Sequence, residues 1–277
     1  MKKYIYFALV FILLLTVYLI IENKRIRISH YQFLDERLEK DIRIAVLSDV
    51  HNDTFGKDNK DLIEKVKQSK PDMIFLTGDL IDKRRTDMDV SIKLVEQLVA
   101  IADCYYIAGN HESVIADYDY FQKKLEEIGV NVINDAAISV GKINIYGIKD
   151  YNFFKQPKEK NEEIISRQLA GLEVEKKEDE INILLVHRPH YFDIYCQYQF
   201  DYIFAGHVHG GQMRLPFVGG VYGPNQGLFP KYDCGLYQKD KTKMIISAGL
   251  GNSLFPLRIF DNPQIVVVDI SANSLPE

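Results

Sequence analysis

Seven side chains of types that bind metal ions follow five short apolar runs of this sequence: Asp49, His51, Asp79, Asn110, His187, His207 and His209. Each of them singly has an ordinary structural explanation as a helix cap, a turn residue or a buried histidine. Five clusters that all follow an apolar run, and that are rich in histidine, are better explained by one shared site. In α/β folds, ligands bind at the carboxyl ends of parallel strands.

The types and number of these side chains indicate a binuclear metal site. If one carboxylate is shared between two ions, the seven side chains supply eight coordination bonds, four to each ion. Imidazole, carboxylate and amide donors without a thiolate suit manganese, zinc or iron better than calcium. We therefore expect two divalent ions, with manganese favoured.

The one-residue spacing of Asp49 and His51, and of His207 and His209 in "GHVHGG", has a physical explanation. Residues i and i+2 of an extended backbone point to the same side, so each pair is expected to place two ligands in one pocket. Three glycines surround the second pair: Gly206, Gly210 and Gly211. They are expected to leave the backbone unobstructed and to tolerate unusual torsion angles.

The elements that must position these residues alternate between strand and helix. The β-branched runs "IRIAVLSD", "DMIFLTGD" and "CYYIAGN" alternate with helical spacing over residues 61–69, 89–101 and 118–129, which predicts parallel strands with crossover helices. Five more runs predict strands ("INIYGI", "INILLVH", "DYIFAGH", "KMIISAG", "QIVVVDI"), with helices over "NEEIISRQLAGL" and near "YFDIYC". So many strands exceed one open sheet. We predict one α/β domain over residues 42–277 with two mixed sheets packed face to face.

The amino-terminal segment predicts a membrane anchor. Residues 4–21 are uncharged, and at ~1.5 Å per residue they span about 27 Å, close to the hydrocarbon thickness of a bilayer. The segment is apolar on all sides, unlike a typical core helix, and "ENKRIRIS" after it lacks the small residues of a cleavage site. We predict an uncleaved transmembrane helix in residues 1–27 and a connector or amphipathic membrane-surface segment over 28–41.

Charge and cysteine content exclude some other classes of protein. The net charge of −5 argues against wholesale nucleic-acid binding. The three cysteines are far apart and form no C-x-x-C pair, so neither a disulfide framework nor a thiolate metal site is indicated. Basic residues flank the apolar segment almost equally on both sides, so the positive-inside rule does not decide its orientation.

The motifs "DVH", "GDLID", "GNHE", "LLVHRPH" and "GHVHGG", in this order, resemble the calcineurin-like metallophosphoesterase superfamily over residues 42–270. Within it, "GHVHGGQMRLPFVGGVYGPNQGLFPKYDCGLY" and "ISAGLGNSLFPLRIFDNPQIVVV" resemble the branch that holds the membrane-associated YkuE-type and LpxG-type phosphohydrolases. The resemblance implies a four-layer αββα sandwich, which agrees with the two expected sheets. It also implies hydrolysis of a phosphoester.

The resemblance assigns the ligands to two ions: Asp49, His51 and His209 to one, Asn110, His187 and His207 to the other, with Asp79 shared. It implies that His111 is the catalytic acid. Asp82 is placed to orient His111, although a loop cap explains Asp82 equally well. Every ligand is present, which argues against the alternative of a non-catalytic metal-binding scaffold.

Residues outside the ligand set bear on the substrate. Arg258 in "PLRIF" is the strongest candidate for contact with a substrate phosphate, because a planar guanidinium suits phosphate, whereas Arg84 and Arg85 fit a solvated loop better. Residues 214–232 combine glycine, proline and aromatic residues directly after the metal histidines, as long functional loops do. Packing of these aromatic residues onto the sheet explains them nearly as well.

An apolar loop beside the metals, on a chain with a membrane anchor, favours a lipid-linked phosphoester or pyrophosphate as substrate. The alternative substrates are soluble nucleotides and cell-wall phosphodiesters, for which the anchor would serve only localisation. The resemblance favours a single-pass protein of the cell membrane with its catalytic domain on the outer face. The expected partners are therefore the lipid bilayer and a phosphorylated substrate.

Overall fold

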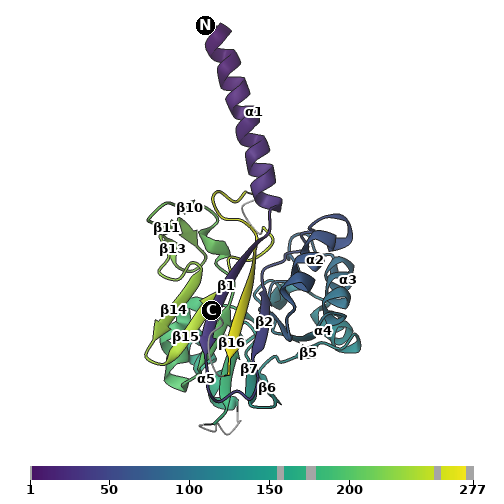
Figure 1. The fold of residues 1–277 in the computed structure, drawn as a ribbon, viewed down its shortest axis with the longest axis vertical. Helices are drawn as coiled ribbons and strands as arrows, with labels where there is room; N and C mark the ends of the chain where they lie inside the picture. The colour runs from purple at the N-terminus through teal and green to yellow at the C-terminus, as the bar shows by residue number, and fades with distance from the viewer. Residues whose placement is uncertain (1, 155–158, 173–178, 253–256, 273–277) are drawn as a thin grey trace.

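Two β-sheets packed face to face, with helices on both outer faces, form the body of the protein (Figure 1). The computed structural model describes residues 2–154, 159–172, 179–252 and 257–272. Within these residues the strands form two six-stranded sheets and two small hairpins. This is the four-layer αββα arrangement that the sequence predicts.

The first sheet has the strand order β1-β16-β2-β3-β4-β5. Its strands are β1 (Arg27–Leu34), β16 (Gln264–Ser271), β2 (Ile42–Leu47), β3 (Met73–Leu76), β4 (Asp103–Tyr106) and β5 (Asn131–Val132). Strands β2 to β5 run parallel, whereas β16 is antiparallel to β2 and parallel to β1. The crossover helices are α2 (Lys60–Ser69), α3 (Met88–Val99) and α4 (Tyr118–Glu127), close to the three predicted ranges.

The second sheet has the strand order β14-β15-β9-β8-β7-β6. Its strands are β14 (Gly235–Lys239), β15 (Thr242–Ile246), β9 (Tyr202–Ala205), β8 (Ile181–Leu185), β7 (Ile143–Gly147) and β6 (Ala136–Val140). The four central strands are parallel, and both edge strands are antiparallel to their neighbours. Helices α5 (Asn161–Gly171) and α6 (Phe192–Tyr195) belong to this half of the chain, where the sequence predicts them.

Three apolar clusters account for the layers. One lies between the first sheet and helices α2 to α4 and contains Leu62, Leu94 and Phe121. A second, with Phe75 and Phe204, lies between the sheets, and a third joins the second sheet to α5 and α6. The parallel strands β2, β3, β8 and β9 are therefore buried on both faces, which explains their largely apolar sequences.

The expected connector over residues 28–41 is wrong for its first half, because residues 28–34 belong to the edge strand β1. Its residues from Arg27 to Leu34 pair with β16. Partly buried Tyr31 and Phe33 pack against the cluster between the sheets. Polar residues alternate with them along an exposed edge, so the strand carries no continuous apolar run that would reveal it.

A single helix of membrane-spanning length, α1 (Lys2–Lys24), is found among the described residues. It projects away from the body, and none of its residues is buried (Figure 1). Its length and composition would allow it to cross a bilayer. Asn23 near its end bonds to the body, where its Oδ1 accepts hydrogen bonds from the backbone N–H of Arg258 at 3.0 Å and the side chain of Asn252 at 3.1 Å.

Candidate metal centre

All seven predicted ligands converge where strands of both sheets end. Asp49 and His51 follow β2, Asp79 follows β3, and Asn110 follows β4 in the first sheet. His187 follows β8, and His207 and His209 follow β9 in the second sheet. All but Asn110, which is partly exposed, are buried. The two sheets thus supply one shared site across their interface.

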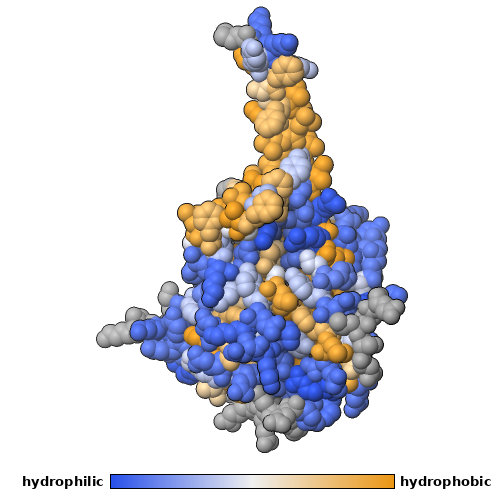
Figure 2. Space-filling view, turned by 60° about the vertical axis from the view of Figure 1, so that its left-hand side comes forward, coloured by the Kyte–Doolittle hydropathy of each residue, from blue (hydrophilic) through white to orange (hydrophobic). Residues whose placement is uncertain are grey.

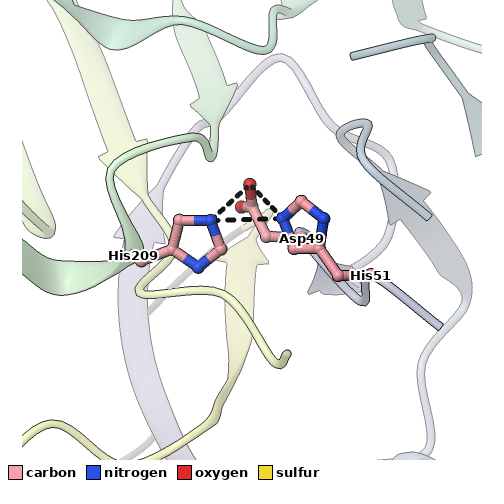
Figure 3. A group of neighbouring side chains, drawn as sticks. All are labelled: Asp49, His51 and His209. Atoms are coloured by element: carbon pink, nitrogen blue, oxygen red, sulfur yellow. Dashed lines mark hydrogen bonds and ion pairs between the residues drawn. The ribbon is translucent and has the colours of Figure 1, made fainter. Parts of the chain in front are cut away.

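The first group of ligands is Asp49, His51 and His209 (Figure 3). The Nε2 atoms of the two histidines lie 3.2 Å apart. Oδ1 of Asp49 lies 3.6 Å from Nε2 of His209 and 3.9 Å from Nε2 of His51. The three donor atoms therefore surround one point, as the assignment to a single ion requires.

The second group is Asp79, His187 and His207, with Asn110 beside it. Nε2 of His187 lies 3.2 Å from Nδ1 of His207, 3.1 Å from Oδ1 of Asn110 and 3.3 Å from Oδ2 of Asp79. Nδ1 of His187 is 2.8 Å from the carbonyl oxygen of Thr77, to which it donates, so Nε2 is the ring nitrogen that faces the cluster.

Asp79 lies between the two groups. Its Oδ2 is 3.3 Å from His187 in the second group and 3.7 Å from His51 in the first. Its other oxygen, Oδ1, accepts the backbone N–H of His111 at 2.8 Å, which fixes the orientation of the carboxylate. This position matches the shared ligand that the family resemblance implies.

The donor set fits two divalent cations. Two imidazole nitrogens with lone pairs repel each other at 3.2 Å unless a cation or proton lies between them, and ligands ~2.1 Å from one ion lie roughly 3 to 3.4 Å apart. Burial lowers the pKa of His51, His207 and His209, so these rings are neutral and able to coordinate. Burial also lowers the pKa of His187, but the charge of Asp79 outweighs it and raises that pKa to about 10.

The backbone around the ligands is not extended, contrary to the expectation for the two one-residue spacings. Five ligands have left-handed backbone: φ is 54° at Asp49, 51° at His51, 54° at Asp79, 74° at His207 and 50° at His209. Such conformations are uncommon for non-glycine residues and collect at functional sites. The strands end before the ligands, and tight turns aim them inward.

The expected role of the glycines is confirmed by the close approach of other groups. A Cβ atom on Gly206 would lie 1.8 Å from Oγ of Ser48 and 2.4 Å from Oδ2 of Asp49. Gly211 has φ of 87°, and its Cβ would lie 2.4 Å from Cα of Gly220. These positions exclude side chains because ligands or backbone occupy the space.

His111 and Asp82 lie at the edge of the centre. Nδ1 of His111 accepts the backbone N–H of Lys83 at 3.2 Å, so the neutral ring carries its proton on Nε2, which is 4.0 Å from Oδ2 of Asp79. Asp82, His111 and His51 have potential ligand atoms within 4.8 Å of one another. Asp82 also accepts the backbone N–H of Arg84 at 2.7 Å, as a loop cap does. The geometry is compatible with both explanations of Asp82.

Arg258 does not occupy the position expected for a substrate ligand. It is fully buried and does not line the cavity beside the metal centre. Its guanidinium donates to the carbonyl oxygens of Ala248 and Gly251 at 2.8 and 2.7 Å, and it lies 3.3 Å from Nδ1 of His209. Arg258 therefore contacts Nδ1 of the candidate ligand His209, on the side of the ring away from the Nε2 atom that faces the cluster. Arg84 and Arg85 are exposed and pair with Asp82.

Glu112, the last residue of "GNHE", has an organising role that the sequence did not reveal. Its buried carboxyl accepts the backbone N–H groups of Asp79 and Gly109, both at 2.9 Å, and of Ile81 at 3.1 Å. Burial and the charge of Asp79 raise its pKa to about 8. Glu112 thereby ties the loop after β3 to the loop after β4. Only the motif's position next to His111 could have suggested it.

Arg188 is a second residue that sequence reasoning missed. It is nearly buried, pairs with Asp150, and its Cζ lies 4.5 Å from the centre of the Tyr151 ring. Its Nη1 donates to Asn225 and lies 3.2 Å from Nε2 of His207. The "HRPH" motif shows that an arginine follows the ligand His187 in the sequence. The direction of the Arg188 side chain, however, depends on Asp150 and Asn225, which are remote in sequence.

A cavity of about 710 Å³ opens beside the metal centre. The ligands or catalytic candidates on its wall are Asp79, Asn110, His111, His207 and His209. Two cationic side chains, Lys83 and Arg188, also line it, and the hairpin residues Val221 and Tyr222 form its other side. The cavity thus combines metal ligands, positive charge and an apolar wall.

Comparison with known proteins agrees with this geometry. The chain is 28% identical over 238 residues to an uncharacterized metallophosphoesterase of Campylobacter jejuni, covering 84% of this chain and 60% of that relative's length. It is 29% identical over 241 residues to the uncharacterized metallophosphoesterase YkuE of Bacillus subtilis, covering 84% of this chain and 80% of YkuE.

The fold is also similar to that of TT1561 of Thermus thermophilus, with a TM-score of 0.53 at 11% identity over 76% of this chain and 90% of that protein. A model of the family described as calcineurin-like phosphoesterase matches residues 42–211, which is more than half of the chain. The match includes all seven ligands. The chain therefore belongs to the calcineurin-like phosphoesterase family, whose members hydrolyse phosphoesters with bound metal ions.

Proposed function

We propose that this chain is a membrane-anchored phosphohydrolase with two divalent metal ions, preferably manganese, that cleaves a phosphoester or pyrophosphate bond of a lipid-linked substrate. One observation carries the binuclear part of the proposal. Oδ2 of Asp79 lies between two groups of ligands, 3.3 Å from His187 and 3.7 Å from His51. A single mononuclear site would not need both groups.

The residues around the cavity have different roles in phosphoryl transfer. When bound, the two ions supply activation of water and neutralise charge on the phosphoryl group. Arg188 and Lys83 add positive charge on the cavity wall, where phosphoryl oxygens would lie. Asp150 and Asn225 hold the Arg188 guanidinium in place before the substrate binds. Its orientation is therefore set in advance.

His111 presents Nε2–H to the cavity because its other nitrogen is occupied by the N–H of Lys83. Burial lowers the pKa of His111, although the charge of Asp79 opposes this effect. A neutral ring is a poor proton donor but a good hydrogen-bond donor. We therefore assign to His111 a hydrogen bond to the oxygen that gains charge during the reaction.

The apolar character of α1 and of the cavity wall supports the membrane and lipid parts of the proposal. The helix projects from the body with no buried residue, and Tyr222, Val221 and Met213 make one side of the cavity apolar. A soluble nucleotide or cell-wall phosphodiester would gain less from that wall. The family resemblance supports a catalytic domain on the outer face of the cell membrane, and protease protection in intact cells tests that orientation.

The test compares substrates and metal content in the full-length chain. We expect manganese-dependent hydrolysis of bis(p-nitrophenyl) phosphate, two ions per chain by elemental analysis, and higher kcat/KM for a long-chain prenyl pyrophosphate in vesicles than for nucleotides. A preference for nucleotides or cell-wall phosphodiesters would favour the alternative function. Absence of turnover with metal bound would identify a scaffold.

The substitution Asp79→Asn tests the shared ligand. Loss of a residue that hydrogen-bonds to a metal ligand typically lowers metal affinity or activity by about 10- to 100-fold. Loss of the shared ligand itself should therefore reduce kcat/KM by more than about 100-fold and lower the metal content. The control is Asp119→Asn on the exposed face of α4. Parent-like turnover of Asp79→Asn would refute the binuclear assignment.

A further inference from the structure

The direction of the strands places the metal centre at the same end of the body as α1. Strand β1 begins at Arg27, directly after α1, and runs parallel to β16. Because β2 is antiparallel to β16, the carboxyl end of β2 returns to the end where β1 begins. Asp49 and His51 follow that end of β2. The centre therefore faces the side from which the helix leaves the body.

The helix is attached to that end by hydrogen bonds rather than by a long linker. Both backbone groups of Arg258 bond to the Asn23 side chain, the N–H at 3.0 Å and the carbonyl at 3.3 Å. Asn262 donates to the carbonyl oxygen of Glu22 at 3.0 Å. Because two residues separate α1 from β1, the surface around the base of the helix must lie close to the membrane that the helix would enter.

A contact between Tyr18 of α1 and Phe260 of the body indicates how the surface around the base of α1 lies relative to the membrane. Their ring centres are 6.3 Å apart. Tyr18 lies three residues before the end of the uncharged run at residue 21, which corresponds to about 4.5 Å along the helix. The uncharged run is only just long enough to span the hydrocarbon. Phe260, on the body, therefore lies at the level of the bilayer interface.

A surface of exposed apolar side chains lies at one side of the base of α1 (Figure 2), and we call it the apolar rim: Leu215, Phe217, Val218, Leu228, Phe229 and Phe260. The first five lie on or beside the hairpins β10–β11 (Arg214–Leu215, Gly219–Gly220) and β12–β13 (Tyr222–Gly223, Gly227–Leu228). Apolar side chains gather at the base of α1 in Figure 2. Phe217 is fully exposed (109%). Contiguous exposed patches of this kind mark sites of interaction.

The backbone of the rim also departs from ordinary conformations. Phe217, Phe229 and Phe260 have φ of 65°, 54° and 54°. Bulky side chains rarely adopt positive φ, and here three of them do so while exposing aromatic rings. The exposed basic residues Lys24 and Arg25 lie at the end of α1, the helix whose Tyr18 contacts Phe260 of the rim. Exposed aromatic rings and basic side chains at the same end of the body suit the boundary between acyl chains and headgroups.

Residues of the same hairpins also line the catalytic cavity. Met213, Val221 and Tyr222 lie on the cavity wall, and Tyr222 pairs across β12–β13 with Leu228 of the rim. Tyr222 is itself half-exposed. An apolar surface thus runs from the metal centre past Tyr222 to the rim.

We propose that the apolar rim inserts into the leaflet that α1 enters, and that the hairpins carry a lipid-anchored phosphoester from the bilayer interface into the cavity. The phosphate then lies at the metal centre while the apolar tail stays on the hairpins and in the bilayer. This inference rests on the proposed membrane anchoring and lipid-linked substrate. It adds the surface through which that substrate enters.

Insertion can be measured directly because the chain contains no tryptophan. Single reporters Phe217→Trp and Phe229→Trp are compared with Tyr120→Trp, an exposed position on α4, in full-length protein in phosphatidylcholine vesicles. We expect lipids with brominated acyl chains to quench both rim reporters at least threefold more than the control. Equal, weak quenching of all three reporters would overturn the insertion, whatever the substrate.

Entry of the substrate is tested by placing charge on the rim. In the double variant Phe217→Asp and Phe229→Asp, we expect kcat/KM for a long-chain prenyl pyrophosphate in vesicles to fall about tenfold or more. Turnover of soluble bis(p-nitrophenyl) phosphate should stay unchanged, which also shows that the fold is intact. The control is Tyr120→Asp.

An equal loss on both substrates, or no loss on either, would overturn the role of the rim in substrate entry. If the parent hydrolyses only the soluble diester, the lipid-linked substrate is wrong. The quenching experiment still reports insertion in that case. The failure of the substrate assignment and the failure of the rim proposal are therefore distinguishable.

Discussion

At the residue scale, the centre depends on backbone conformations as much as on the ligand side chains. Five of the seven ligands have positive φ, and backbone hydrogen bonds such as His51 N–H to the Asp79 carbonyl at 3.0 Å hold them there. Strained residues persist only when their surroundings fix them. Small intrusions into this backbone should therefore displace ligands and reduce activity.

The substitution Gly206→Ala tests this dependence. The new methyl group would meet Ser48 and Asp49, so we expect displacement of Asp49 and about a 100-fold loss of kcat/KM on bis(p-nitrophenyl) phosphate, since misplacement of about 1 Å can cost that much. The control is Gly171→Ala at the end of α5, where a Cβ would contact nothing within 4 Å. Comparable activity of the two variants would contradict the argument.

The role of His111 is tested by changing the leaving group. For a hydrogen-bond donor, we expect His111→Ala to reduce kcat by about 100-fold, by similar factors for aryl and alkyl phosphodiesters. Gln offers an N–H near the position of Nε2–H, so His111→Gln should recover part of the activity. A much larger loss for the alkyl ester would instead identify His111 as a proton donor.

At the scale of elements, β1 makes the amino-terminal segment part of the catalytic body. Phe33 on this strand contacts Tyr202 of β9 with ring centres 5.3 Å apart, and Lys243 lies over its ring. The strand therefore links the edge of the first sheet to the second sheet. It also fixes where α1 leaves the body. A flexible connector would do neither.

The substitution Phe33→Ala distinguishes a strand from a connector. Loss of this partly buried ring should lower the free energy of unfolding by about 2 kcal/mol, less than the ~3–5 kcal/mol of a fully buried Phe. Gln32→Ala on the exposed side of the same strand should change it by less than about 0.5 kcal/mol. Denaturant unfolding in detergent measures both, and equal values would argue against packing of this strand.

At the scale of the whole molecule, the metal centre joins the two sheets. The ligands after β2, β3 and β4 belong to the first sheet, and those after β8 and β9 belong to the second. Ions bound between them would bind the folded state and not the unfolded chain. Metal binding should therefore add to the stability of the entire body.

Addition of Mn²⁺ to metal-free protein should raise the thermal midpoint by roughly 5 to 10 °C at 100 times Kd, from a stabilisation of about 2.7 kcal/mol. The rise should shrink as the pH is lowered. His187 has a pKa of about 10 without metal, so below that pH the ion must displace a proton, and its affinity falls as protons become more abundant. Differential scanning fluorimetry at pH 6 and pH 8 checks both points. If Mn²⁺ raised the thermal midpoint of the Asp79→Asn variant as much as that of the parent, this account would be contradicted.

Much of the fold could be predicted because its central strands are buried on both faces and its helices have a periodic apolar face. The runs at β3 and β9 are entirely apolar, those at β2 and β8 contain one polar residue each, and α2 and α3 show helical spacing. Edge strands β1, β6 and β14 were missed because none of their residues is fully buried. The apolar pattern of a strand is least clear in the sequence where only one face of the strand packs against the protein.

The sequence by itself predicted the seven candidate ligands, because metal chemistry restricts each ligand to a few residue types and strand ends bring these types together. Only the tertiary structure decided where other polar groups point. Arg258 contacts Nδ1 of His209, whereas Arg188 and Lys83 line the cavity. The direction of a long side chain depends on partners remote in sequence, such as Asp150 for Arg188. Likewise, the position of the centre beside α1 follows from the antiparallel pairing of β16 with β2, a contact between the two ends of the chain that no local pattern encodes.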